Sequence, residues 1–394
     1  MPAYGTAAVM LPRLARTSGV ALLTAAFVVG APLLVLLAQD QLAAGMVVIE
    51  RSAALVLKHG TPYLGAPHLS SWIAYNPYLP AMALFGLPSA AGVQGAPGAP
   101  QVWLVLGTVI VLGGAFRASV PHPVTKCEAC RGDVVRYTAF AAASPVLALN
   151  LAVTTTDTPV LALILLSLAL VTRPARLAGL TGPSGLPSLV GPSGPVGLTG
   201  LTGPSGLDGL AGCPGRIVAS AVALGLACAM KPTAWPAVLV IAAMLRTRDG
   251  TKAALTFTGS AIGVAVAVML PAIIAAPGAM VDNAVLFPLG LTQHLTPADS
   301  LTPGDLLARA GPAGHALAVA LLIAAGVAVA ASLVWRPPLS ARAAAWRLAI
   351  GLTLMFALGP AERFGYFIYP LGLVGWLFLT KSRGRPTPEV GVGG

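Results

Sequence analysis

Three ionisable residues stand at the ends of apolar segments, where a charge is costly and is a functional candidate by default. Asp157 lies in the sequence NLAVTTTDTPVLAL, with threonines on both sides. Its carboxylate can cap a following helix, since Thr158 and Pro159 come directly after it. It can also contact a ligand. The sequence leaves both roles open, and they can coexist.

Lys231 and Arg363 are isolated cations at comparable positions, in ACAMKPTAWP and GPAERFGYFIYP. An ammonium between two closely spaced apolar segments can hold a phosphate as a point charge, or it can extend to lipid headgroups. A guanidinium can bind phosphate through two parallel hydrogen bonds, or it can pair with its neighbour Glu362. On one side of a membrane, the two cations together predict a site for an anionic headgroup.

Two carboxylates, Asp40 and Glu50, are candidate general bases in the long segment 39–101. A carboxylate close to a membrane surface is placed to take a proton from a sugar hydroxyl. Tyr75 and Asn76 follow in the same segment as candidate substrate contacts. The aromatic residues there fit sugar stacking and an interfacial aromatic belt equally well.

A second long segment, 277–314, contributes His294 as a further candidate substrate contact, with an ordinary loop histidine as the alternative. Long loops are disproportionately functional. We therefore expect binding residues in segments 39–101 and 277–314 first of all.

No metal or cofactor is expected. One CxxC pair, Cys127 and Cys130, follows His122, but a structural zinc site needs four ligands. The four cysteines have no disulfide-like spacing and are expected to be free thiols. The sequence contains no phosphate-binding P-loop and no metalloprotease helix motif.

Transmembrane helices must position these residues. The chain is 56% hydrophobic and 9% charged, with a mean hydropathy of +0.84, whereas soluble domains are about a quarter charged. Apolar segments of near-spanning length without period-two alternation predict helices. We expect an all-α bundle of about ten membrane helices: 18–38, 102–116, 137–153, 158–172, 216–230, 234–245, 253–276, 315–334, 345–359 and 364–380.

The distribution of positive charge predicts the orientation. With both termini in the cytoplasm, 18 of the 23 basic residues fall on the cytoplasmic side, as the positive-inside rule requires. This bias explains the net charge of +11 without nucleic acid as a partner. The first apolar segment is long for a signal peptide, so it is expected to be retained.

Residues 77–92 are apolar but broken by three prolines. A full span here would reverse the side of every later loop. We therefore favour a re-entrant or surface-lying helix over a full crossing.

Glycine recurs at every third position from Gly179 to Gly215, with Ser188 as the only interruption. This is collagen-like spacing. Few Y positions hold proline, which favours a flexible cytoplasmic loop over a trimerising element. The segment divides the chain into an amino-terminal membrane region, 1–178, and a carboxy-terminal one, 216–385, with a tail at 386–394.

Several pieces in order resemble the polyprenyl-phosphate-dependent membrane glycosyltransferases of the GT-C fold, in the phosphatidylinositol-mannoside mannosyltransferase branch. The pieces are RSAALVLKHGTPYL, YNPYLPAMALFGLP, TTTDTPVLALILLSLAL, ACAMKPTAWP, FPLGLT and ERFGYFIYP. The resemblance implies transfer of a mannose-like sugar, with inversion, from a polyprenyl phosphate to a lipid or cell-envelope glycan on the extracytoplasmic face. It places Lys231 and Arg363 at phosphate-binding positions.

The chain departs from this family in one respect. The family commonly has an aspartate shortly before the RSAALVL-like helix, where this chain has Gly45. Asp40 or Glu50 is expected to substitute, with Asp40 slightly preferred because it follows the first span. The alternatives are a non-enzymatic transporter or lipid-binding protein and a catalytically degenerate relative that acts as a scaffold. The sequence does not determine the oligomeric state.

Overall fold

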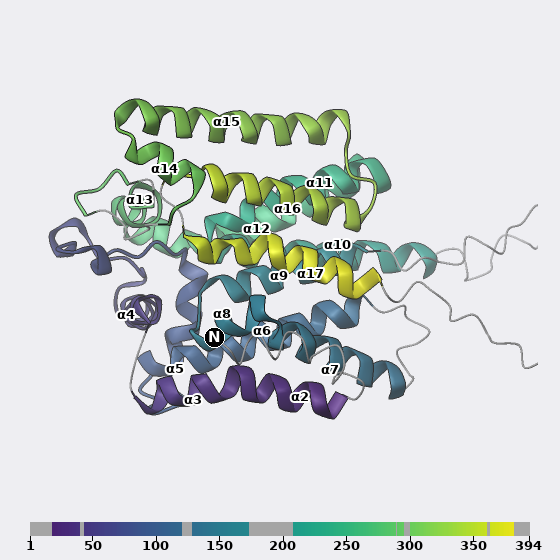
Figure 1. Cartoon of the computed structure of the whole chain (residues 1–394), viewed down its shortest axis with the longest axis horizontal. Helices are drawn as coiled ribbons and strands as arrows, with labels where there is room; N and C mark the ends of the chain where they lie inside the picture. The colour runs from purple at the N-terminus through teal and green to yellow at the C-terminus, as the bar shows by residue number, and fades with distance from the viewer. Residues whose placement is uncertain are drawn as a thin grey trace, which may run out of the picture.

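The computed structural model describes residues 18–39, 43–119, 128–172, 208–288, 290–294, 300–360 and 363–381 of the 394. Within these residues every regular element is a helix, as predicted. In Figure 1 many of the longer helices run along the long axis of the molecule. The helices α4, α13 and α14 gather at one end of the bundle, which we call the loop end.

Five helices are long and apolar enough to cross a membrane. The first is Gly19–Ala38, which covers all but the first residue of α2 (Ser18–Ala25), together with η1 (Ala26–Gly30) and α3 (Ala31–Ala38). The others are α6 (Pro100–Ala118), α12 (Thr251–Ala275), α15 (Pro312–Trp335) and α16 (Ala341–Leu358). The described chain is therefore a multi-pass helical membrane protein by the length and composition of its helices.

A sixth candidate span is broken in the middle. The helices α7 (Glu128–Ala143) and α8 (Pro145–Ala152) meet at an angle of 71°. Pro145 cannot continue the hydrogen-bond pattern of α7. Ser144 instead begins a new helix, and its side chain accepts a hydrogen bond from the backbone nitrogen of Leu147.

Each of the ten predicted segments coincides with a helix, but four of these helices fall outside the five-to-six candidate spans. They are α9 (Asp157–Val171), α10 (Asp208–Met230), α11 (Trp235–Asp249) and α17 (Ile368–Lys381). The helix α9 is buried along almost its whole length. Hydropathy alone cannot distinguish a helix enclosed by other helices from one exposed to lipid.

The two long segments are largely helical rather than irregular. The first contains α4 (Ala44–His59), η2 (Ala66–His68), η3 (Trp72–Ala74), η4 (Pro80–Gly86) and α5 (Leu87–Ala90). The second contains α13 (Pro277–Val281), η7 (Asp282–Leu286) and α14 (Pro303–Arg309). The apolar helix Pro80–Ala90 is too short to cross roughly 30 Å of hydrocarbon.

Glycine residues allow two pairs of core helices to pack closely, α17 against α9 and α10 against α12. A Cβ atom built on Gly372 in α17 would lie 2.4 Å from Cδ2 of Leu161 in α9. One built on Gly225 in α10 would lie 2.6 Å from the carbonyl oxygen of Ala261 in α12. Small residues at such contacts let membrane helices pack backbone to backbone.

Some sequence predictions fall outside the described residues. They include Asp40, the tail 386–394 and most of the glycine-triplet segment. The end of that segment is described and differs from the prediction, because α10 begins at Asp208 and so includes the last glycine triplets. Of the four cysteines, Cys130 lies in α7, and Cys213 and Cys228 lie in α10; Cys228 is a buried free thiol.

Candidate functional site

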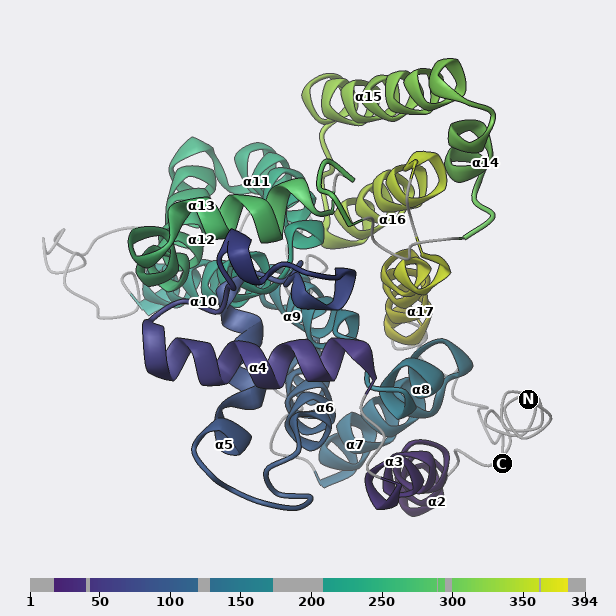
Figure 2. The same ribbon diagram turned by 90° about the vertical axis from the view of Figure 1, so that its left-hand side faces the viewer.

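A cavity of about 490 Å³ opens at the loop end of the bundle. It is lined by α4, by the first long segment, by the turn between α8 and α9, and by the segments after α10 and α16. Figure 2 views the molecule from this end, with α4 lying across the bundle. Of the predicted site residues, Asp157, Lys231, Arg363 and Tyr75 all line the cavity.

A buried ion pair joins Asp157 and Lys231. Nζ of Lys231 lies 2.6 Å from Oδ1 of Asp157, and both side chains are less than a tenth exposed. The hydroxyl of Tyr369 donates to the same oxygen at 2.8 Å and accepts from Thr233 at 3.1 Å. Among the described residues, the other oxygen, Oδ2, accepts no hydrogen bond.

The predicted capping role of Asp157 is wrong. Asp157 is the first residue of α9, and the capping position belongs to Thr156, whose side chain makes no capping hydrogen bond. The carboxylate turns instead toward Lys231. A charged partner at hydrogen-bond distance stabilises a buried carboxylate more strongly than a neutral backbone amide does.

Lys231 follows directly after α10, where its backbone nitrogen donates to Ala227. Its ammonium lies 5.4 Å from the ring centre of Tyr78 and 5.2 Å from that of Tyr366, within the range of cation–π attraction. Burial acts to lower the pKa of Lys231, but the charge of Asp157 and the two tyrosines outweigh it and raise the pKa above its ordinary value. The cation is therefore held in its charged form.

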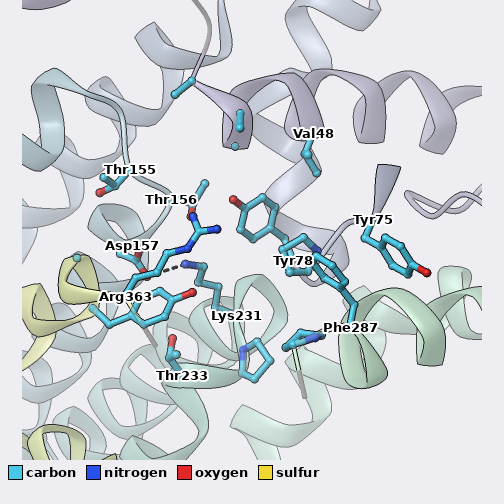
Figure 3. Close-up of a pocket in the computed structure, with 18 of the residues that line it drawn as sticks. Val48, Tyr75, Tyr78, Thr155, Thr156, Asp157, Lys231, Thr233, Phe287 and Arg363 are labelled. Atoms are coloured by element: carbon cyan, nitrogen blue, oxygen red, sulfur yellow. Dashed lines mark hydrogen bonds and ion pairs between the residues drawn. The ribbon is translucent and has the colours of Figure 1, made fainter. Parts of the chain in front are cut away.

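Arg363 supplies the second positive charge and precedes the short helix η8 (Phe364–Phe367). Its side chain is exposed and lines the cavity. Within the described part of the chain its guanidinium makes no hydrogen bond or ion pair. Glu362, the alternative partner, lies outside the described residues. Figure 3 shows the Arg363 and Lys231 side chains extending into the same space.

Aromatic rings form the opposite wall. Tyr75 and Phe287 stack with ring centres 4.5 Å apart and planes 9° apart. His294 meets Tyr75 edge-on at 6.4 Å, so the predicted site histidine lies behind a residue that lines the cavity. In Figure 3 this stack lies across the cavity from Arg363.

Asn76 does not line the cavity but fixes its wall. Its backbone nitrogen donates to Oδ1 of Asn283 in η7 at 2.8 Å, and its amide donates to Ser52 in α4 at 2.9 Å. Asn283 in turn donates to the carbonyl oxygen of Leu64 at 3.1 Å. All three polar side chains are at most 2% exposed. We call Asn76, Asn283 and Ser52 the asparagine latch.

Arg51 holds the same wall from α4. Its guanidinium donates to the carbonyl oxygens of Ile73 and Ala74, each at 2.9 Å. The segment that presents Tyr75 is thereby fastened to α4. Neither Arg51 nor Asn283 stood out in the sequence as a site residue. The local signal was weak, because the latch depends on a contact between residues 207 positions apart.

Of the two candidate bases, Glu50 is described, and it does not line the cavity that holds the cations. Asp40 lies outside the described residues. Glu50 lines a second cavity and accepts a hydrogen bond from Ser89 there. Gly45 lines the first cavity, and a Cβ atom built on it would lie 2.9 Å from the hydroxyl of Tyr78. Gly45, near which the resembled family has an aspartate, therefore faces the cavity, but it carries no carboxylate.

Among the described residues no group of three or more histidine, cysteine or acidic side chains is arranged to hold a metal ion. The cavity offers instead two cations, one carboxylate, hydroxyls and aromatic faces. The cations are suited to bind an oxyanion, and the hydroxyls and aromatic faces are suited to contact a polar or ring-shaped group beside it.

The fold and the cavity define a class: a multi-pass helical membrane protein with a cationic, aromatic-lined site at one end of its bundle. The comparisons take the identification no further. No protein-family model, no curated protein and no solved structure matches the chain.

Proposed function

We propose that this chain is an inverting glycosyltransferase that moves a mannose-like sugar from a polyprenyl phosphate to a lipid or cell-envelope glycan on the extracytoplasmic face. One observation carries the proposal. Lys231 and Arg363, from distant parts of the chain, line one cavity together with an aromatic wall that contains Tyr75. The family resemblance of the sequence supports the same activity.

The charge of the cavity suits a lipid-linked phosphodiester. Among its described lining residues, Lys231 and Arg363 are positive and Asp157 is negative, which leaves one positive charge in excess. A sugar joined to a polyprenyl phosphate carries one negative charge. When the bond between the anomeric carbon and the phosphate oxygen breaks, the phosphate gains charge, and cations fixed in advance stabilise it.

The acceptor completes the reaction in a single displacement. Its hydroxyl oxygen bonds to the anomeric carbon from the face opposite the phosphate, and its proton passes to a carboxylate. We assign this base to Asp40, which directly follows the first span. The aromatic faces of Tyr75 and Phe287 are suited to contact the sugar ring.

A transfer assay tests the proposal. Full-length protein in lipid nanodiscs is incubated with radiolabelled polyprenyl-phosphate mannose and membrane lipid extract. Arg363→Ala should lower transfer about tenfold or more, since a charge-assisted contact contributes roughly 1.5–3 kcal/mol. Asp40→Asn should abolish it. The matched control is Lys58→Ala, which removes an exposed cation of α4 that does not line the cavity.

A second function has its own supporting observation. The one carboxylate among the described lining residues is already paired with Lys231, as expected of a lipid-binding protein or a degenerate scaffold without a base. Binding of polyprenyl phosphate that depends on Arg363, with no transfer from mannosyl, other hexosyl or pentosyl donors, would establish this alternative and reject the enzyme.

A further inference from the structure

A second cavity, of about 650 Å³, lies on the other side of α4 from the first. Gly45 and Val48 of α4 line the first cavity, and Glu50 lines the second. At 3.6 residues per turn, Glu50 points about 200° away from Val48 around the helix. The two cavities are therefore separate, and α4 is the partition between them.

One wall of the second cavity is apolar and belongs to the first membrane helix. Leu34, Leu36 and Leu37 of α3 line it, at the end of a span that is only slightly buried within the protein. A hydrocarbon chain lying in the membrane beside this helix could therefore enter the cavity sideways.

The other wall is polar and carries an unsatisfied group. Glu50 is oriented by the hydrogen bond from Ser89. Gln101, at the start of α6, is 2% exposed, and its Oε1 has no hydrogen-bond partner. A buried polar group left without a partner costs about 1–3 kcal/mol. A ligand that supplies the missing hydrogen bonds would recover this free energy.

The loop between α5 and α6 gives this wall a fixed shape. Gly92 and Gly95 adopt positive φ angles of 90° and 68°, a conformation that glycine adopts without strain. A hydrogen bond of 2.7 Å from Nε1 of Trp103 to the carbonyl oxygen of Pro97 fastens the loop to α6. The wall is thus built in advance of any ligand.

The chemistry of these groups selects the headgroup. The carboxylate of Glu50 disfavours an anionic headgroup. The amide of Gln101 offers both a donor and an acceptor, and a hydroxyl can satisfy both, whereas an ammonium only donates. We propose that the second cavity binds an uncharged glycolipid, with its sugar hydroxyls against Glu50 and Gln101 and its chain along α3. This proposal does not depend on the proposed transferase activity.

Photolabelling tests the proposal. Full-length protein is placed in phosphatidylcholine nanodiscs that contain a photoactivatable glucosyl diacylglycerol, and the labelled peptides are identified by mass spectrometry. We expect saturable labelling of residues 34–38 and 92–101. Gln101→Leu should weaken it about tenfold, the equivalent of about 1.4 kcal/mol.

A second pair of variants distinguishes loss of binding from misfolding. Leu36→Trp narrows the cavity beside α3 and should weaken the labelling, whereas Leu23→Trp, at a side chain of the same span that is 73% exposed and does not line the cavity, should not. Arg363→Ala, in the first cavity, should also leave it unchanged. Non-saturable labelling, insensitivity to Gln101→Leu and Leu36→Trp, or equal labelling by a phosphatidylethanolamine probe would overturn the proposal.

Discussion

Asn76 and Asn283 join the two long segments of the chain through one buried hydrogen bond of 2.8 Å. The bond places η7, and with it Phe287, beside the segment after η3 that contains Tyr75. The aromatic wall of the first cavity exists because this contact is made.

Asn283→Leu should destabilise the protein by about 1–3 kcal/mol, because it leaves the backbone nitrogen of Asn76 and the carbonyl oxygen of Leu64 buried without partners. Thermal unfolding in detergent measures the change. The control is Thr247→Val, which removes an exposed side-chain hydrogen bond within α11. Equal effects of the two substitutions would contradict the latch.

Arg51→Met should loosen residues 71–75 without unfolding the bundle, since the guanidinium donates to two carbonyl oxygens of that segment. Hydrogen exchange should become faster at these residues and remain unchanged in α12. Lys58→Met, two turns further along α4 on an exposed side chain, provides the comparison. Protection at residues 71–75 that persists in Arg51→Met would refute the role of Arg51.

Asp157→Asn and Lys231→Met should each cost about 3–5 kcal/mol, because each leaves an unpaired charge in a buried site. The double variant should cost much less than the sum of the two. A double-mutant cycle on the free energy of unfolding measures the difference. Additive effects would show that the two side chains do not form the pair described.

Alkaline pH should weaken the same ion pair. The pKa of Lys231 in the folded protein lies above its ordinary value of 10.5, so its contribution to stability is fully present below about pH 10.5 and is lost as the pH rises through the folded value. The difference in melting temperature between wild type and Lys231→Met should therefore stay constant from pH 8 and shrink above about pH 10.5. A difference that grows with pH would reverse this assignment.

The sequence predicted the helical membrane class and helical structure in each of the ten segments, because long apolar stretches are a local signal, but only five to six of the expected ten spans are long and apolar enough to cross a membrane. It also singled out Asp157, Lys231 and Arg363 as candidate site residues, because charges at the ends of apolar segments are rare. That these three line one cavity now rests on the arrangement of α9, α10 and η8.

Other features could not be predicted in this way. Asp157 does not cap α9; its carboxylate forms an ion pair with Lys231, 74 positions away. The latch at Asn283 and the separation of Glu50 from the cations by α4 depend equally on long-range packing. Hydropathy did not place α4 among the predicted membrane helices, since the pairs Glu50–Arg51 and Lys58–His59 interrupt its apolar residues.

The close approach at Gly372 has a consequence for the charges of the cavity. Leu161 lies one helical turn after Asp157 on α9, and Gly372 lies one turn after Tyr369 on α17. A methyl group at residue 372 would overlap the end of the Leu161 side chain, so this side chain would have to move to make room. Even the smallest side chain at residue 372 would therefore disturb the packing one helical turn from the hydrogen bond between Tyr369 and Asp157.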